Sequence, residues 1–244
     1  MTVLLMNPFD LVISDKEQVD FDEIFMSGAN RQQLLQLIKE HFYEAALREY
    51  GLTINNKLLL YGESGCGKTL TAKAMAKALG KALLVLNLSN IISARIGETS
   101  QHLKQVFDKA SRERAVLFLD EFDQIGKART SNDREVGEIR RLTNTLIQLI
   151  DYYPGNSLLI AATNHKAMID HALLRRFQIT ISYDRPTNAE LDHYYEQIIR
   201  GFPATLRSVN RVYGISYAEA RDCVLTQVKN NLIRQLEKEN KNAI

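Results

Sequence analysis

Five short apolar runs, separated by longer amphipathic segments, constrain the fold of this chain more than any other feature. The runs lie at 57–61, 82–87, 115–119, 157–162 and 178–182. Most of them are nearly all apolar rather than alternating, which is typical of strands buried on both faces. The segments with helical spacing lie at 31–50, 68–79, 100–113 and 134–150. This alternation of strands and helices predicts an α/β fold built on a parallel sheet.

The strand-like pattern stops after Pro186. Two segments with helical spacing follow, one at 188–200 and a longer one from Ser216 to about Glu239. Ser216 followed three residues later by Glu219 is a capping-box pattern, which marks a helix start. We therefore expect two domains, an α/β domain over residues 1–185 and a small all-helical domain over residues 186–244.

Residues 62–69 fit the pattern G-x-x-x-x-G-K-[ST] between an expected strand and an expected helix. Glycines there let backbone N–H groups turn inward around phosphate oxygens, and the helix N-terminus adds a favourable dipole. Lys68 is expected to reach the β- and γ-phosphates of ATP, and the Thr69 hydroxyl to ligate Mg²⁺. The expected nucleotide-binding residues are Gly62, Glu63, Ser64, Gly65, Cys66, Gly67, Lys68, Thr69 and Leu70. The alternative is a chance glycine-rich turn, which the strand–loop–helix context disfavours.

The apolar run 116–119 ends in two acidic residues, Asp120 and Glu121. A strand of a parallel sheet places such carboxylates at the carboxyl edge, where ligands bind in open α/β folds. We expect Asp120 to hold Mg²⁺ through water and Glu121 to polarise the attacking water as a general base. An acidic strand end can instead merely cap the next element. Its position downstream of a phosphate loop favours the catalytic role.

Asn164 stands at the end of another apolar run, and two arginines follow a short helical turn further on. The Asn164 amide can hold the lytic water or sense the γ-phosphate, although asparagine after a strand most often serves a turn. Arg175 and Arg176 can be a solvated face. They can also be arginine fingers that reach a neighbouring subunit's nucleotide and stabilise transition-state charge.

In this order and spacing, the four motifs resemble those of the AAA+ ATPases, specifically the classical AAA clade, and the resemblance covers nearly the whole chain. Residues 62–69 look like Walker A, 116–121 like Walker B, and Asn164 like sensor 1. Residues 173–177 are similar to the paired arginine fingers, although the usual Pro-Gly between them is missing. Residues 21–24 look like the lead-in to the family's adenine pocket.

The resemblance implies a three-layer P-loop NTPase core followed by a helical lid. It also implies an ATPase that binds ATP and Mg²⁺ between the subunits of a homo-oligomeric ring, usually a hexamer. The segment from Arg141 to Asp151 resembles the family's arginine-bearing second-region helix. Arg221 is one candidate for a sensor 2 arginine, and a solvated helix residue is the favoured alternative.

One departure concerns the segments that resemble pore loops, 93–99 and 127–137. Arg95 stands where threading members of the family usually have an aromatic residue. Aromatic side chains hold unfolded polypeptide by non-directional burial, whereas Arg95 favours acidic or polar segments or simply faces solvent. This difference argues against processive unfolding, although not against remodelling of a protein substrate.

Charge and composition bear on the partners. Lys plus Arg is 31 and Asp plus Glu is 29, a net charge of +2, which leaves little electrostatic footprint for nucleic acid. The two cysteines suggest neither a disulfide framework nor a zinc site, so a reducing compartment fits. The chain shows no signal peptide and no apolar stretch long enough to span a bilayer. We expect a cytoplasmic protein without a membrane partner.

The leading hypothesis is therefore a ring-forming ATPase that remodels a protein substrate. The alternative is a nucleic-acid-associated AAA+ ATPase of the clamp-loader, initiator or helicase-loader type, and a nucleotide-gated scaffold ranks last. The sequence also resembles small prokaryotic AAA ATPases encoded near subtilisin-like proteases, with spore-type and HORMA-remodelling ATPases as comparable alternatives. Since the expected core and lid use nearly all 244 residues, we expect recruitment, and any proteolysis, to belong to a separate adaptor or protease chain.

Overall fold

A computed structural model describes residues 12–93, 99–127 and 133–241, and the chain divides into two compact units. The first unit holds the chain up to Gly62 and then Lys68–Ser182. The second unit holds Glu63–Gly67 and the chain from Tyr183 onward. Arg95 and residues 128–132 of the expected second pore loop lie outside the described residues.

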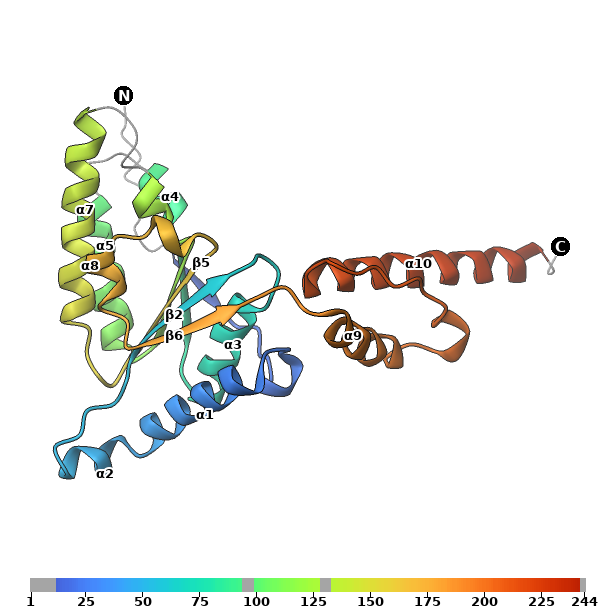
Figure 1. Ribbon diagram of the computed structural model, residues 1–244, viewed down its shortest axis with the longest axis horizontal. Coiled ribbons are helices and arrows are strands. Elements are labelled where there is room, and N and C mark those ends of the chain that lie inside the picture. The colour runs from blue at the N-terminus through green and yellow to red at the C-terminus, as the bar shows by residue number, and fades with distance from the viewer. Residues whose placement is uncertain (1–11, 94–98, 128–132, 242–244) are drawn as a thin grey trace. The chain divides into compact units, whose positions relative to one another are not determined.

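The first unit is built on a six-stranded, mostly parallel sheet (Figure 1), which confirms the predicted fold class. The strands are β1 (Val12–Asp15), β2 (Lys57–Gly62), β3 (Leu83–Asn87), β4 (Val116–Asp120), β5 (Leu158–Thr163) and β6 (Ile179–Tyr183). Their spatial order is β1-β3-β4-β5-β2-β6. The pairs β3–β4, β4–β5 and β2–β5 are parallel, whereas β1 pairs antiparallel with β3. The apolar-run pattern missed β1 because only Val12 and Ile13 of its four residues are apolar.

Eight helices belong to the described part of the first unit. They are α1 (Gly28–Phe42), α2 (Glu44–Glu49), α3 (Lys68–Ala78), α4 (Leu88–Ser93), α5 (Thr99–Arg112), α6 (Gln124–Lys127), α7 (Asp133–Asp151) and α8 (His171–Leu174). Short 3₁₀ turns are η2 (Phe21–Glu23) and η4 (Lys166–Met168). The single helix expected over 31–50 is divided at Tyr43, which leaves the helical conformation between α1 and α2.

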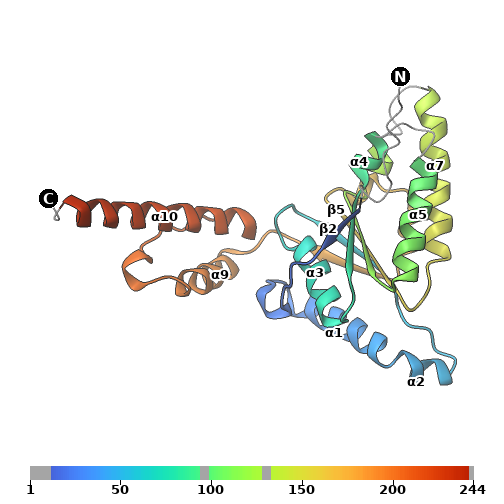
Figure 2. The ribbon, with the colours of Figure 1, turned by 180° about the vertical axis from the view of Figure 1, so that it is seen from behind.

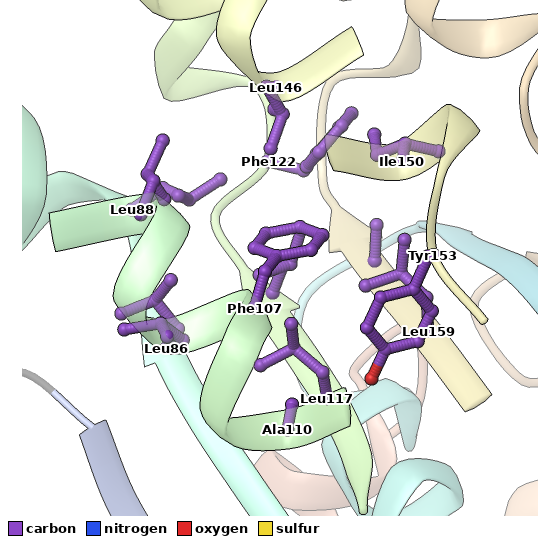
Figure 3. Packing of buried hydrophobic residues seen from close by; sticks show 14 of the residues in the cluster. Leu86, Leu88, Phe107, Ala110, Leu117, Phe122, Leu146, Ile150, Tyr153 and Leu159 are labelled. Carbon is purple, nitrogen blue, oxygen red and sulfur yellow. The ribbon is translucent and has the colours of Figure 1, made fainter. Parts of the chain in front are cut away.

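Helices cover both faces of the sheet, so the unit has three layers (Figures 1 and 2). Helices α1 and α3 lie on one face, and α5 and α7 lie on the other. Between the sheet and α5/α7, Phe107 packs among Leu117, Ile150 and Tyr153 (Figure 3). The rings of Phe107 and Tyr153 meet edge to face, with their centroids 5.6 Å apart. The large apolar area buried on this face stabilises the layer and holds the strands that carry the site.

The second unit is helical, as predicted for a lid. Its elements are α9 (Asn188–Arg200), η5 (Ala204–Leu206) and α10 (Tyr217–Lys241). Its core is formed by the buried side chains of Leu191, Tyr195, Leu206, Ala220, Val224 and Val228. The predicted capping box at the start of α10 is confirmed, since the backbone N–H of Glu219 donates to Ser216 Oγ at 3.3 Å and that of Ser216 donates to Glu219 Oε2 at 2.7 Å. No helix among the described residues is long and apolar enough to cross a membrane.

Residues 63–67 belong to the second unit together with the chain from Tyr183 onward, and Tyr183 is also the last residue of β6. The backbone N–H of Glu63 donates to Tyr183 O at 2.9 Å, and that of Ala218, at the start of α10, donates to Gly65 O at 3.1 Å. The Arg185 guanidinium donates to Glu63 Oε2 at 3.2 Å and to Gly214 O at 3.3 Å. The middle of the phosphate loop is therefore held in place by the beginning of α10.

We predict that Phe107→Ala lowers the free energy of unfolding by about 3–5 kcal/mol, because it removes a buried ring and leaves a cavity. The matched control is Phe42→Ala at the end of α1, where the side chain is 67% exposed and the loss should stay within about 0.5 kcal/mol. Urea denaturation of both variants measures the difference. Equal losses for the two would contradict the packing described here.

We also predict that Gly65→Ala is more damaging than Gly51→Ala. Both glycines have a φ near +70°, so an alanine is strained at either position by about 1–2 kcal/mol. A Cβ at Gly65 would lie 2.6 Å from Ser216 Oγ, whereas a Cβ at Gly51 meets nothing within 4 Å. Gly65→Ala should therefore lower Tm further than Gly51→Ala and weaken ATP binding. Identical Tm values and affinities for the two variants would refute this contact.

Candidate active site

The phosphate loop leaves β2 at Gly62 and enters α3 at Lys68. Gly62, Gly65 and Gly67 all have positive φ angles, of 128°, 72° and 107°. Residues with a Cβ rarely adopt this backbone conformation. The Lys68 ammonium donates to Gly62 O at 2.8 Å, which closes the base of the loop. Thr69 and Leu70 are exposed at the start of α3. Their positions keep the Thr69 hydroxyl accessible to a ligand.

Cys66 has a packing role within the loop. Its side chain is buried, and its Sγ lies 3.6 Å from Ser64 O. Neither Cys66 nor Cys223 forms a disulfide in the described part of the chain. A buried thiol of this kind packs as a small apolar side chain.

Asp120 ends β4 at the carboxyl edge of the sheet, where it is half-buried. Burial raises the pKa of Asp120 above its ordinary value, while a hydrogen bond from the backbone N–H of Glu121 and the positive charge of Lys68 oppose that rise. Helix α3, which begins at Lys68, packs against β4, which ends at Asp120. The end of β4 and the start of α3 therefore lie at the same edge of the sheet in the first unit.

The oxygen donors at this edge fit Mg²⁺. Among the described residues, no group of three or more His, Cys, Asp or Glu side chains could hold a metal ion. Magnesium in nucleotide enzymes is characteristically bound by one or two protein oxygens, together with substrate phosphates and water. One carboxylate, Asp120, and one hydroxyl, Thr69, match this requirement for a metal that arrives with a phosphorylated substrate.

Glu121 has a backbone conformation that is uncommon for a residue with a side chain. Its φ is +54°. This backbone conformation has a free-energy cost for a non-glycine residue, which contacts with the surrounding structure must offset. The following backbone is anchored, because the N–H of Phe122 donates to Ala162 O at 2.9 Å and the Phe122 ring packs edge to face on Phe177. The fold thus holds Glu121 in a strained turn directly after β4, as is common for residues at functional sites.

Two residues to which the sequence analysis assigned no role fix the position of Asn164. The Thr163 hydroxyl at the end of β5 donates to Asp123 Oδ1 at 2.8 Å, and it accepts the backbone N–H of His165 at 2.9 Å. Both Thr163 and Asp123 are buried. Asn164 is therefore held between two anchored neighbours, with its side chain exposed. The sequence signal that could have pointed to Thr163 and Asp123 is that polar residues follow both β4 and β5, two strands that pair directly.

A further anchor lies between the ends of β5 and β2. The Lys166 ammonium stacks over the ring of Tyr61, with its Nζ 3.9 Å from the ring centroid. Tyr61 directly precedes Gly62 and pairs in register with Thr163. This cation–π contact connects η4 with the strand that leads into the phosphate loop.

The two arginines differ in their surroundings. Arg175 is exposed, and its guanidinium makes no hydrogen bond or ion pair within residues 12–93, 99–127 and 133–241. Arg176 is half-buried. Its Nε and Nη2 donate to the carboxylate of Asp151 at 3.3 and 3.4 Å, and its Nη1 donates to Ala172 O at 2.7 Å.

The first unit brings some of the expected site residues together and leaves others apart. Asp120 and Asn164 follow β4 and β5 at the carboxyl edge of the sheet, and Lys68 follows β2 at the same edge. The arginine pair instead leads into Gln178, whose N–H donates to the carbonyl of Lys57 at the amino end of β2. The two ends of β2 are roughly 17 Å apart at 3.3 Å per residue. The backbone of the arginine pair therefore lies away from the carboxylate edge of its own subunit.

Comparison with known proteins agrees with this geometry. The family model described as "ATPase family associated with various cellular activities (AAA)" matches residues 58–185, more than half of the chain. An AAA family ATPase of Sinorhizobium fredii, y4kL, whose function is uncharacterized, is 34% identical over 217 residues, or 88% of this chain and 66% of the relative. A proteasome-associated ATPase of Salinispora tropica is 32% identical over 223 residues, or 80% of this chain and 37% of the relative.

A solved structure supports the fold. The crystal structure of the FIGL-1 AAA domain has a TM-score of 0.67 with this chain at 18% identity, and the match covers 87% of this chain and 72% of that domain. The chain spans about two thirds of the rhizobial relative and little more than a third of the proteasome-associated one. With the family model, the rhizobial relative and the phosphate-loop fold in agreement, the chain belongs to the AAA family of ATPases.

Proposed function

We propose that this ATPase hydrolyses Mg-ATP at the subunit interfaces of a homo-oligomeric ring, a hexamer, and couples hydrolysis to the remodelling of a protein substrate. One observation carries the proposal. The carboxylate edge with Asp120 and Glu121 is assembled within one unit, whereas the exposed Arg175 belongs to a part of that unit away from this edge. A second copy that supplies Arg175 completes such a site.

In the proposed reaction, Glu121 takes a proton from water as the water oxygen attacks the γ-phosphorus, and Asn164 orients that water. The bond from the γ-phosphorus to the β–γ bridging oxygen breaks, and its electron pair leaves with ADP. The products are ADP and inorganic phosphate. Lys68 and the backbone N–H groups of the loop bind the phosphate oxygens.

The implied metal has a defined place in this scheme. Asp120 and the Thr69 hydroxyl would hold Mg²⁺, which supplies Lewis-acid neutralisation of phosphate charge when bound. By sequence, Arg175 and Arg176 are the candidate arginine fingers. The exposed Arg175 would supply positive charge to a neighbour's γ-phosphoryl group, where negative charge builds up in the transition state.

The partner class follows from the relatives. Relatives named proteasome-associated ATPases favour a protein substrate over the alternative of a nucleic-acid-associated ATPase, and the net charge of +2 agrees. We further propose that a separate adaptor or protease chain supplies recruitment. Cys66 and Cys223, which both lie among the described residues, form no disulfide. We therefore propose a reducing compartment such as the cytoplasm.

We predict that Glu121→Gln binds ATP like the wild type but lowers kcat by about 10²–10⁴-fold, because the amide cannot accept the proton of the attacking water. Phosphate release and equilibrium binding of ATP measure the two effects separately. The matched control is Glu113→Gln, an exposed carboxylate at the end of α5, which should leave both unchanged. Near-normal hydrolysis by Glu121→Gln would remove Glu121 from the role of general base.

We predict that two inactive variants, Glu121→Gln and Arg175→Ala, regain ATPase activity when their subunits are mixed. A site that combines Glu121 of one chain with Arg175 of the other is intact, and random mixing makes about a quarter of the interfaces of this kind in a heterologous ring. The variants are combined under dissociating conditions and reassembled before phosphate release is measured. Turnover no higher than the sum of the separate variants would argue against a shared site, as would full activity per chain after dilution below the assembly range.

A further inference from the structure

We propose that the two adjacent arginines have different tasks, and this proposal rests on the inter-subunit site proposed above. Arg175 alone reaches the neighbouring nucleotide. Arg176 is a positioning residue, which acts with Asp151 to hold α8 so that Arg175 is presented correctly. Asp151 thereby gains a role that its place at the end of α7 does not by itself suggest.

The guanidinium of Arg176 is bound within its own subunit. All three guanidinium nitrogens donate within the same subunit, two to the carboxylate of Asp151 and one to Ala172 O. Two nitrogens facing two carboxylate oxygens form a bidentate fork, which fixes orientation as well as distance. The side chains of Arg176 and Asp151 are 27% and 45% exposed. To reach another subunit's phosphate, Arg176 would have to leave all three contacts.

The contacts of Arg176 join helix α7 to helix α8. Asp151 is the last residue of α7, and Ala172 lies in the four-residue helix α8. The N-terminus of α8 is capped by Asp170, which accepts the N–H of Ala172 at 2.6 Å, and the helix is anchored in the core by Leu173. A helix this short has little stability of its own. Its position therefore depends on such attachments, and the Arg176–Asp151 ion pair is one of them.

Arg175 differs from Arg176 in its side-chain contacts. Arg175 is the C-cap of α8, and its backbone N–H donates to His171 O at 3.2 Å. Its side chain is exposed and unpaired in the described part of its own subunit. An arginine that acts on another subunit must keep its donors available, and Arg175 does so. Arg176 does not, since its donors are already used.

Lys57 is a further charged group near the Arg176–Asp151 pair, and the test must take its charge into account. Burial lowers the pKa of Lys57, and the negative charge of Asp151 opposes that shift, so Lys57 and Arg176 share the field of one carboxylate. A reversed ion pair would place two cations together at this position. The test is therefore made in a Lys57→Gln background, which should have close to wild-type turnover.

The experiment reverses the ion pair. In the Lys57→Gln background, Arg176→Asp alone and Asp151→Arg alone should each lower kcat by about 100-fold, the size of effect expected when a catalytic group is displaced by about 1 Å. The KM for ATP should change little. Combining the two substitutions should restore kcat to within about threefold of the background, because the ion pair is rebuilt with its charges exchanged. If the double variant folds but stays as inactive as Arg176→Asp, the cation at position 176 is itself required, and the proposal is overturned.

A milder variant keeps the proposal testable if the charge reversals impair folding. Asp151→Asn leaves Arg176 cationic and releases it from its ionic partner. If Arg176 only positions α8, kcat should fall. If Arg176 is a finger, kcat should stay at the wild-type level, and that outcome refutes the proposal. Tm values separate misfolding from misplacement. The control is the pair Glu44–Arg48 on α2, with side chains 24% and 73% exposed, which is reversed in the same way and should leave kcat unchanged.

Arg175→Ala separates this proposal from the function on which it rests. If Arg175→Ala keeps wild-type turnover, the inter-subunit site itself fails, whatever Arg176 does. If Arg175→Ala is inactive and regains activity when mixed with Glu121→Gln, but the reversed ion pair is inactive, only the division of tasks fails.

Discussion

The parallel pairing of β4, β5 and β2 is the constraint on which the rest of the structure depends. Parallel strands end at the same edge, so Asp120, Asn164 and Gly62, where the phosphate loop begins, gather there although they are far apart in sequence. The pairing itself is stabilised by burial of both sheet faces under helices. A change that shifted β5 by one residue would turn Thr163 away from Asp123 and so release Asn164.

Much of both units could be predicted because the signals are local. The five apolar runs each correspond to a strand, and the capping box at Ser216 and Glu219 marks the start of α10. The exceptions have physical reasons. Strand β1 is stabilised by pairing with β3 rather than by its own composition. At Tyr43 the backbone leaves the helical conformation, although the hydrophobic pattern of the sequence continues without a break.

The candidate site shows where prediction from sequence ends. The spacing of the motifs placed carboxylates, an amide and a lysine at strand ends, because each motif is read within a few neighbouring residues. The contacts that orient these groups join distant positions: Thr163 and Asp123 are 40 residues apart, and Arg176 and Asp151 are 25 apart. No local pattern specifies such pairs, since they exist only after the helices have packed on the sheet.

The grouping of Glu63–Gly67 with the helical unit has a thermodynamic consequence. The carbonyl of Gly65 accepts the N–H of Ala218, and the space above Gly65 is filled by Ser216. The loop and the start of α10 are thus two parts of one packed element. Their conformations are coupled, and the coupling free energy is the same in both directions. Any ligand that favours one conformation of the loop favours one arrangement of the helix start by the same free energy. Conversely, a displacement of the start of α10 shifts the conformation of residues 63–67 by the same linkage.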